Sequence, residues 1–171
     1  MDSLIKQRIS QLDDRAVLQV LSEASQNLRE QLSDKEAMVI GSADDARAAV
    51  AALIVAGDGD IIDANSITFE GPQAARAARE LLMTLLEDPD AKPAVEPVLE
   101  NPPADSQKSP ELAVAGAVIL GALITWLQTA IEIEVNRKDG KLDFNFKLKK
   151  KASNSNIISV TAKTVSRLIG V

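Results

Sequence analysis

The chain has 171 residues, no cysteine and no histidine, and its 25 acidic side chains outnumber 19 lysines and arginines, which gives a formal net charge of −6. Without cysteine there is neither a disulfide nor a thiolate metal site, and without histidine most acid–base and transition-metal designs are excluded. The acidic balance argues against broad nucleic-acid binding, which needs a concentrated cationic face. No secretory signal pattern begins at Met1, so a cytoplasmic protein is expected.

Residues 1–87 are expected to form a mainly α-helical, acidic unit. A helix is predicted over residues 3–33 with a break at Asp13, because an aspartate carboxylate can cap the start of a second helical segment. The leucines of that segment have a heptad-like spacing: Leu18, Leu21, Leu28 and Leu32. Such spacing predicts one apolar face that packs against a partner helix.

Two further helices and a short β-like region are expected in the same unit. Ser42 can cap one helix through its hydroxyl, and Pro72 suits the first turn of another that ends near Glu87. Between these helices, residues 60–63 and 66–70 have the composition of short strands. They predict a small hairpin or an edge pair.

Residues 88–110 hold six of the seven prolines of the chain, among acidic and small polar residues. This composition predicts a semi-extended Pro-rich linker without a fold of its own. The charge also changes sign beyond it. Residues 1–110 carry 20 acidic and 10 basic side chains, a net charge of −10, whereas residues 111–171 carry 5 and 9, a net charge of +4.

Residues 111–171 are expected to form a helix–hairpin–helix unit, which makes the whole chain an α+β protein. Asp139 and Gly140 are typical central residues of a type I′ turn, since both tolerate a positive φ. The turn sets a register that pairs apolar residues on one face: Val135 with Phe144, Ile133 with Phe146 and Ile131 with Leu148. A helix over about 156–169 follows. The apolar face of the hairpin needs a cover, which the preceding helix can provide.

That preceding helix is predicted over Leu112 to Ile131, a stretch with no charged residue. At about 1.5 Å per residue it would span about 30 Å, the thickness of the hydrocarbon core of a bilayer. Small residues recur every four positions along it and permit close approach of another backbone. The residues expected to pack or interact are Ala113, Ala117, Gly121, Thr125 and, on the bulkier side of the helix, Trp126.

A membrane span and a buried helix packed on the hairpin are both compatible with this composition. The strand begins directly after the helix, with no loop to cross a headgroup region, and spanning would require translocation of the acidic N-terminal unit. Both points favour the packed helix. The lysines that follow the second strand, Lys149, Lys150 and Lys151, are candidates for contact with an anionic membrane, at about 1 kcal/mol each. The alternative for them is a solvated strand end.

In its layout, the C-terminal half resembles the effector-associated constant component proteins. The likeness rests on the apolar run Leu112 to Trp126, the strand Ile131 to Val135, the turn Lys138-Asp139-Gly140-Lys141 and the closing helix. That family is predicted to accompany effector modules in bacterial conflict and signalling systems, so the resemblance implies adaptor work. The N-terminal 87 residues and the lysine run depart from the family's pattern.

Together these features predict a non-catalytic adaptor or assembly subunit that binds a protein partner, or itself, through the small-residue helix. The alternative is a membrane-inserting effector that is released from the acidic N-terminal unit. No P-loop, dinucleotide, nucleophile-elbow or zinc motif occurs, so no catalytic residue, metal or cofactor is assigned. An enzyme would need a carboxylate cluster that only folding creates.

Overall fold

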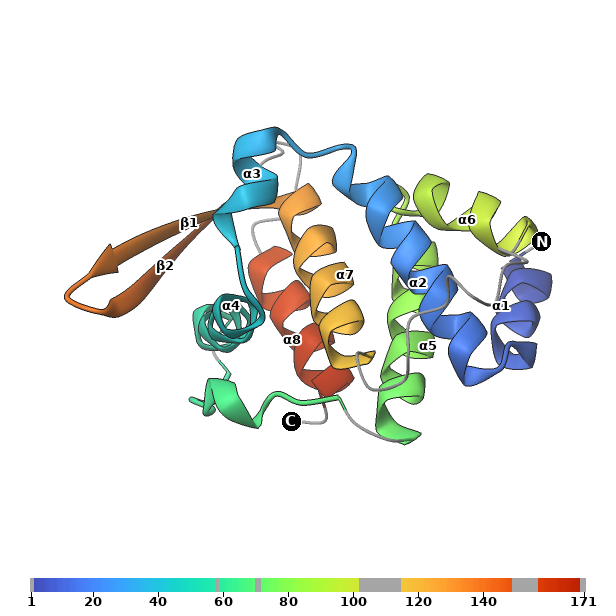
Figure 1. Cartoon of the computed structure of the whole chain (residues 1–171), viewed down its shortest axis with the longest axis horizontal. Coiled ribbons are helices and arrows are strands. Elements are labelled where there is room, and N and C mark those ends of the chain that lie inside the picture. Colours follow the sequence, from blue (N-terminus) through green and yellow to red (C-terminus); the bar gives the residue numbers. More distant parts are fainter. Residues whose placement is uncertain (1, 58, 70–71, 102–114, 149–156, 170–171) are drawn as a thin grey trace. The chain divides into compact units, whose positions relative to one another are not determined.

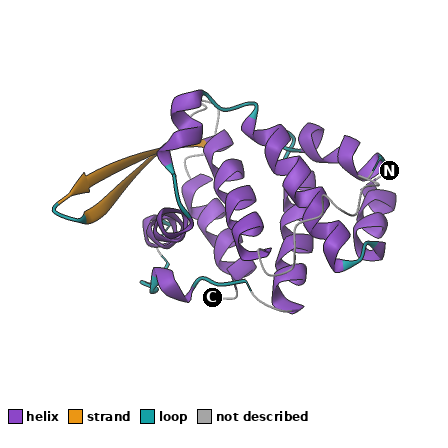
Figure 2. Ribbon diagram, in the orientation of Figure 1, coloured by secondary structure: helices purple, strands orange, loops and turns teal. Residues whose placement is uncertain are grey.

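The structure is a computed structural model that describes residues 2–57, 59–69, 72–101, 115–148 and 157–169. These residues form eight α-helices, one 3₁₀ turn and one antiparallel hairpin, so the expected α+β class is confirmed (Figure 1 and Figure 2). The chain divides into two compact units, each assembled from two segments. The first comprises Met1–Gln31 and Phe69–Trp126, and the second comprises Leu32–Thr68 and Leu127–Val171. This division differs from the expected succession of 1–87, 88–110 and 111–171, which stays a prediction.

The first unit is helical throughout its described part. Its elements are α1 (Asp2–Gln11), α2 (Asp14–Arg29), α5 (Pro72–Glu87), α6 (Lys92–Glu100) and the part of α7 (Ala115–Ala130) up to Trp126. The predicted break at Asp13 is confirmed, because its carboxylate accepts a hydrogen bond from the Ala16 N–H at 2.7 Å and caps α2. The predicted helix that begins at Pro72 is confirmed as well.

Large aliphatic side chains fill the interior of this unit, where α2 packs against α5 and α6. Among them are Leu18, Leu21 and Leu28 of α2 and Leu81, Leu82 and Leu85 of α5, each at most 1% exposed. Burying one leucine stabilises a fold by roughly 1.5–3 kcal/mol. The leucine face of α2 therefore finds its partner helices within the same unit, apart from Leu32, which belongs to the second unit.

The expected linker is wrong for its central part, which forms the helix α6. Pro93 lies in the first turn of α6, where a missing N–H loses no intrahelical bond. The buried residues of α6 are Ala94, Val95, Val98 and Leu99. Their spacing puts them on one helical face, and burial of that face outweighs the proline-rich composition. In addition, Asn27 Nδ2 donates to the Ala94 carbonyl at 3.0 Å. Residues 102–110 of the expected linker lie outside the described residues.

The second unit combines helices with the hairpin. Its elements are α3 (Asp34–Val39), α4 (Ala43–Ala56), the 3₁₀ turn η1 (Ala64–Ser66), the end of α7, β1 (Ile131–Lys138), β2 (Lys141–Leu148) and α8 (Ile157–Ile169). Helix α4 packs against α8 and also contacts β2, while α3 packs against β1. Among the described residues, α3 and α4 thus contact the hairpin more extensively than α7, the helix that precedes it.

Serine caps begin the two helices that follow Leu32. Ser42 Oγ accepts a hydrogen bond from the Asp45 N–H at 3.1 Å, which confirms the predicted start of α4. At the start of α3, Ser33 and Glu36 form a reciprocal capping box, in which each side chain accepts a hydrogen bond from the other residue's N–H at 3.2 Å. We did not predict α3, although a serine followed three residues later by a glutamate is a known helix-start signal.

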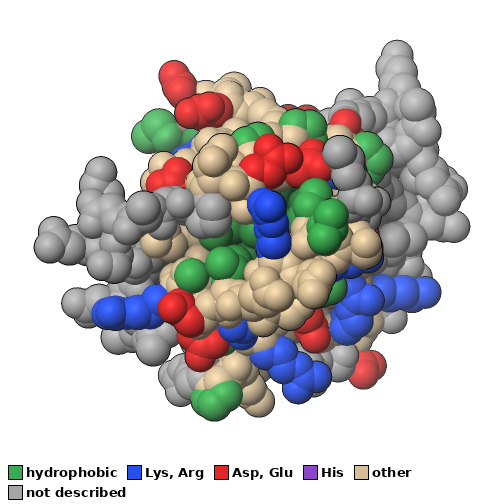
Figure 3. All heavy atoms as spheres, turned by 90° about the vertical axis from the view of Figure 1, so that its right-hand side faces the viewer, with side chains coloured by type: hydrophobic (Ala, Val, Ile, Leu, Met, Phe, Trp, Pro, Cys, Tyr) green, Lys and Arg blue, Asp and Glu red, His purple; other side chains and the backbone are tan. Residues whose placement is uncertain are grey.

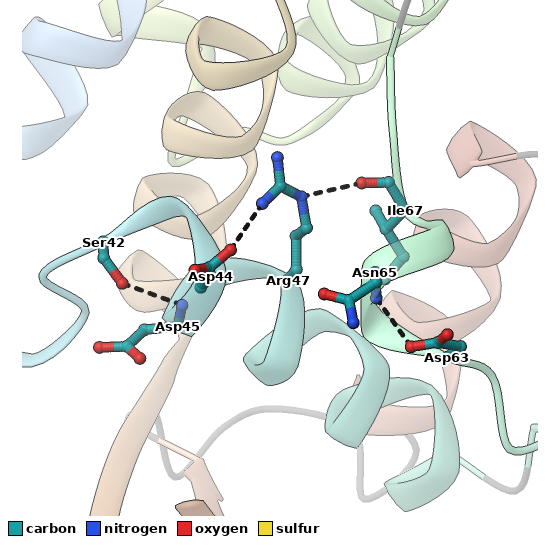
Figure 4. A network of polar contacts seen from close by, with 7 residues as sticks. All are labelled: Ser42, Asp44, Asp45, Arg47, Asp63, Asn65 and Ile67. Carbon is teal, nitrogen blue, oxygen red and sulfur yellow. Dashed lines mark hydrogen bonds and ion pairs between the residues drawn. The ribbon is translucent and has the colours of Figure 1, made fainter.

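The described residues between 59 and 69 form no strand, so the predicted β pair is wrong. The chain instead makes the 3₁₀ turn η1, which begins where Asp63 Oδ1 accepts a hydrogen bond from the Asn65 N–H at 3.0 Å. Arg47 then holds the end of the turn, since its Nε donates to the Ile67 carbonyl at 3.1 Å (Figure 4). Such side-chain bonds to the backbone compete with strand pairing, which explains the difference.

The hairpin has the register that its turn predicts. Val135 pairs with Phe144, Ile133 with Phe146 and Ile131 with Leu148. Asp139 and Gly140 have φ angles of 54° and 77°, as a type I′ turn requires. Ile131 is therefore the first strand residue and not the last residue of the helix. In the hairpin, Ile131 and Ile133 are buried, whereas Val135, Phe144 and Phe146 are only half-buried.

Candidate functional site

The predicted packing residues of the uncharged helix lie on two sides of α7. Ala117 and Gly121 are exposed, and a Cβ added at Gly121 would meet no atom within 4 Å. Thr125 and Trp126 are buried, with exposed fractions of 7% and 9%. Ala113 lies outside the described residues. The exposed side, which we call the α7 face, consists of Ala117, Gly121 and the half-buried Val118, which is adjacent to them on the helix surface.

Hydrogen bonds satisfy the polar groups on the buried side of α7. Thr125 Oγ1 donates to the Gly121 carbonyl at 2.8 Å, within the helix. Trp126 Nε1 donates to Asp88 Oδ2 at 2.8 Å, which ties α7 to the end of α5 inside the first unit. Trp126 is thus a structural anchor, and the surface that remains for a partner carries only small, uncharged side chains.

One glycine of α7 already shows the close backbone approach that small residues allow. A Cβ added at Gly116 would lie 3.3 Å from the carbonyl oxygen of Phe69, which belongs to the same unit. This distance is shorter than an ordinary van der Waals contact. The small residues of the helix therefore serve close packing at Gly116 and leave an open face at Gly121.

The uncharged stretch Leu112 to Ile131 is long enough, as a helix, to span a membrane. The described part of that helix, α7, has 16 residues. Within the part of the chain that the structure describes, no helix is both long and apolar enough to cross a bilayer. The candidate lipid contacts Lys149, Lys150 and Lys151 lie outside the described residues.

A groove of about 780 Å³ runs beside β1 in the second unit. It is lined by Ser33, Lys35, Glu36 and Val39 from α3 and its cap, by Gln128 at the end of α7, and by every residue of β1 from Glu132 to Arg137. Successive side chains of a strand point to opposite faces of the sheet, so a cavity lined by six consecutive strand residues follows the edge of the strand. We call it the β1 groove.

Polar contacts hold the walls of the β1 groove in place. Gln128 Nε2 donates to the Glu36 carbonyl at 2.7 Å, which fixes α3 beside the end of α7 within the second unit. Arg137 pairs with Asp45 of α4 at 2.6 Å, and the Asp45 side chain is only 12% exposed. Both the helical wall and the outer part of β1 are therefore braced by contacts inside their own unit.

A cross-strand ion pair joins the two strands on the polar face of the hairpin. Lys147 Nζ lies 3.0 Å from Glu134 Oε1, diagonally across the strands. The hydrogen bond and the charge of Lys147 lower the pKa of Glu134, and the same pair raises the pKa of Lys147. Both groups are solvent-exposed, so the pair orients the Glu134 carboxylate without removing it from water.

A smaller cavity of about 400 Å³ lies in the first unit. Its lining residues are Ile5, Lys6, Leu86, Glu87, Pro89 and Lys92. Lys6 and Glu87 approach to 3.7 Å across it, with both side chains largely exposed. Figure 3 shows the side of the molecule on which α1 and α6 lie in Figure 1, where hydrophobic, acidic and basic side chains are interspersed. Because this surface has no dominant chemical character, we assign it no function.

The β1 groove could not be recognised from the sequence, because it depends on the placement of α3. Only the capping box of Ser33 and Glu36 and the charge pattern of β1 gave local signals for it. Among the described residues, no group of three or more acidic side chains could hold a metal ion. The features that characterise the β1 groove are the edge of β1 and the helix α3.

Comparison of the chain with protein families, with characterised proteins and with solved structures finds no match. The resemblance of the C-terminal half to effector-associated constant component proteins therefore stays a prediction. Function has to be inferred from the geometry of the α7 face and the β1 groove.

Proposed function

We propose that the protein is a non-catalytic adaptor or assembly subunit, whose α7 face associates with a second copy of the chain. The observation that supports this function is the exposure of Ala117 and Gly121 on a helix without any charged residue. Surface helices of globular proteins normally place charged or polar residues on their outer side. An outer side of small, uncharged residues is typical of a helix that packs against another helix.

The chemistry of the α7 face favours close helix–helix contact over hydrogen bonding. Small side chains allow two helix axes to approach to about 8 Å, where Cα–H groups can contact carbonyl oxygens across the interface. Thr125 adds no polar requirement, since its hydroxyl already donates to the Gly121 carbonyl. Each small residue buries little area, so the flanking Val118 has to contribute to the interface as well.

Filling the α7 face with a large side chain tests the proposal. Gly121→Leu should prevent close approach and reduce the mass of the full chain, measured by light scattering, to that of a single 18.2 kDa subunit. The subunit should still fold, because a Cβ at Gly121 meets no neighbouring atom and leucine has a helix propensity better than that of glycine by roughly 0.8–1 kcal/mol.

Gln73→Leu is the matched control, since it adds a leucine at an exposed position of another helix, α5. It should leave the mass unchanged. Equal masses for the wild-type chain and Gly121→Leu at every concentration would contradict the proposal, as would an equal effect of both substitutions.

A further inference from the structure

The strand β1 has one edge that is not used by the hairpin. In the described part of the chain the sheet contains β1 and β2 only. One edge of β1 pairs with β2 over its whole length, and the other edge borders the β1 groove. Unpaired edges of this kind are ready templates for an additional strand.

The register identifies the backbone groups that face the groove. Lys138 and Lys141 flank the two-residue turn, so this pair exchanges both of its N–H···O=C bonds, and such pairs then alternate along an antiparallel ladder. Consequently, Ile133, Val135 and Arg137 direct their N–H and C=O groups away from β2. No hydrogen bond found among the described residues uses these groups. Each of the three residues thus offers one donor and one acceptor to the groove.

The opposite wall of the groove suits a single extended chain. Helix α3 packs against β1 and supplies Lys35, Glu36 and Val39 to the lining. The segment from Glu132 to Arg137 extends for about 20 Å at roughly 3.3 Å per residue, and an added strand would lie about 4.8 Å from it. A groove between a strand edge and a helix is the geometry by which proteins bind a peptide as an extra strand.

We infer that the β1 groove binds an extended segment of a partner protein, in which apolar residues alternate with basic ones, as a third strand of the sheet. This inference concerns a surface other than the α7 face and does not depend on the proposed self-association. A second copy is the less suitable occupant, because it would bring two paired strands into a space that α3 closes on the far side.

The apolar half of this pattern follows from one face of the hairpin. Val135, Phe144 and Phe146 share that face and are only half-buried, and the two phenylalanine rings stack at a centroid distance of 6.5 Å. Every second side chain of an added strand would extend the same face and cover part of these residues. A two-stranded sheet is marginally stable alone, so a third strand also stabilises the hairpin.

The basic half follows from the charges on the other side of the groove. Glu132 and Glu134 lie on the polar face of β1, and Glu36 of α3 is the third acidic residue of the lining. The lining contains three carboxylates and two cations; Arg137 pairs with Asp45, and Glu134 pairs with Lys147 of β2. The carboxylates of the lining outnumber its cations by one. Lysine or arginine side chains of a bound segment would therefore complete the charge balance on this side.

The test uses the full chain and a synthetic peptide of eight residues that alternates valine and lysine, with blocked ends. We expect saturable binding, with the largest amide chemical-shift changes at Ile133, Val135 and Arg137. A peptide that alternates valine and glutamate, and one with N-methyl groups on its pairing edge, should each bind at least about tenfold more weakly. Equal binding of the N-methylated peptide, or shift changes located elsewhere, would overturn the inference.

Two proline substitutions separate the groove edge from the fold of the hairpin. Val135→Pro removes an N–H that points into the groove, and Leu142→Pro removes one from the outer edge of β2, so neither interrupts the β1–β2 ladder. We expect Val135→Pro to lower peptide affinity at least about tenfold and Leu142→Pro to leave it unchanged. An equal loss in both variants would contradict a site on β1.

A charge reversal checks the same site without touching the backbone. Glu132 is exposed, so Glu132→Lys should preserve the fold and shift the preference of the groove from the valine–lysine peptide toward the valine–glutamate peptide. Gly121→Leu should bind both peptides like the wild type, which distinguishes failure of this inference from failure of the self-association. If no peptide binds and Val135→Pro instead abolishes association of the chain with itself, the occupant is a second copy and the inference is wrong.

Discussion

Leu82 and Leu85 on α5 are fully buried, whereas Phe144 and Phe146 on β2 remain half-exposed although they are larger and lie on the apolar face of the hairpin. The difference arises from the number of layers around each element. Helix α5 is packed by both α1 and α2 as well as by α6, while the hairpin is a two-stranded sheet that α3 and α4 contact. The first arrangement provides stability, and the second leaves apolar surface that a partner can cover.

Truncating one side chain on each surface tests this contrast most strongly. Leu85→Ala should lower the free energy of unfolding by about 2–5 kcal/mol, because it opens a cavity in a filled interior. Phe144→Ala should lower it by only about 1–2 kcal/mol, since much of the ring is already in water. Urea unfolding followed by circular dichroism measures both values. If the two losses are equal, the hairpin is as well packed as the helical unit.

A change in the turn tests whether the hairpin depends on local conformation more than on burial. Gly140 has a φ of +77° with no neighbour within 4 Å of an added Cβ, so Gly140→Ala should cost about 1–2 kcal/mol through backbone strain alone. Gly41 is equally unobstructed and lies outside the left-handed region, so Gly41→Ala is the control. Gly41→Ala should leave the free energy of unfolding unchanged or raise it slightly. Hydrogen exchange of the amides in β1 and β2 monitors the hairpin. If both Gly140→Ala and Gly41→Ala lose amide protection there, the effect is not specific to the turn.

The smallest expected effect concerns the ion pair on the solvent side of the hairpin. Lys147 lowers the pKa of Glu134 from its ordinary value, so the pair stabilises the hairpin at neutral pH, and this contribution is lost as the pH falls through the folded-state pKa of Glu134. The raised pKa of Lys147 implies that the contribution is also lost at high pH, as that group deprotonates. A carboxyl-carbon NMR titration should show the low Glu134 pKa, and Lys147→Gln should return it to the ordinary range.

Where sequence and structure agree, short-range chemistry determines the outcome. The hairpin register follows from Asp139 and Gly140 together with the alternation of apolar residues, and the starts of α2 and α4 follow from the side chains of Asp13 and Ser42. Each of these signals acts over a few residues. Such elements can be placed from the sequence to within a residue or two.

Where the sequence prediction and the structure differ, contacts between segments that are distant in the chain determine the local structure. Helix α6 forms in a proline-rich stretch because Val95 and Leu99 are buried in the first unit. The turn after Asp63 is held by Arg47, 20 residues before Ile67, whose carbonyl accepts a hydrogen bond from the Arg47 side chain. The candidate sites divide in the same way. The spacing of Ala117 and Gly121 in the sequence predicts a packing role, which stays a prediction, whereas the β1 groove requires α3, which precedes β1 by more than 90 residues in the chain.

The interleaving of the two units also constrains how the chain matures as it is made. Helix α4 is synthesised early, yet its packing partner α8 begins at Ile157, so α4 must wait for roughly 100 further residues. At about 5–20 residues per second this delay lasts roughly 5–20 s. The first unit can close sooner, once the polypeptide has been extended to Trp126. During this interval the apolar side of α4 lacks its partner, which makes it a site where a ribosome-associated chaperone would be most useful.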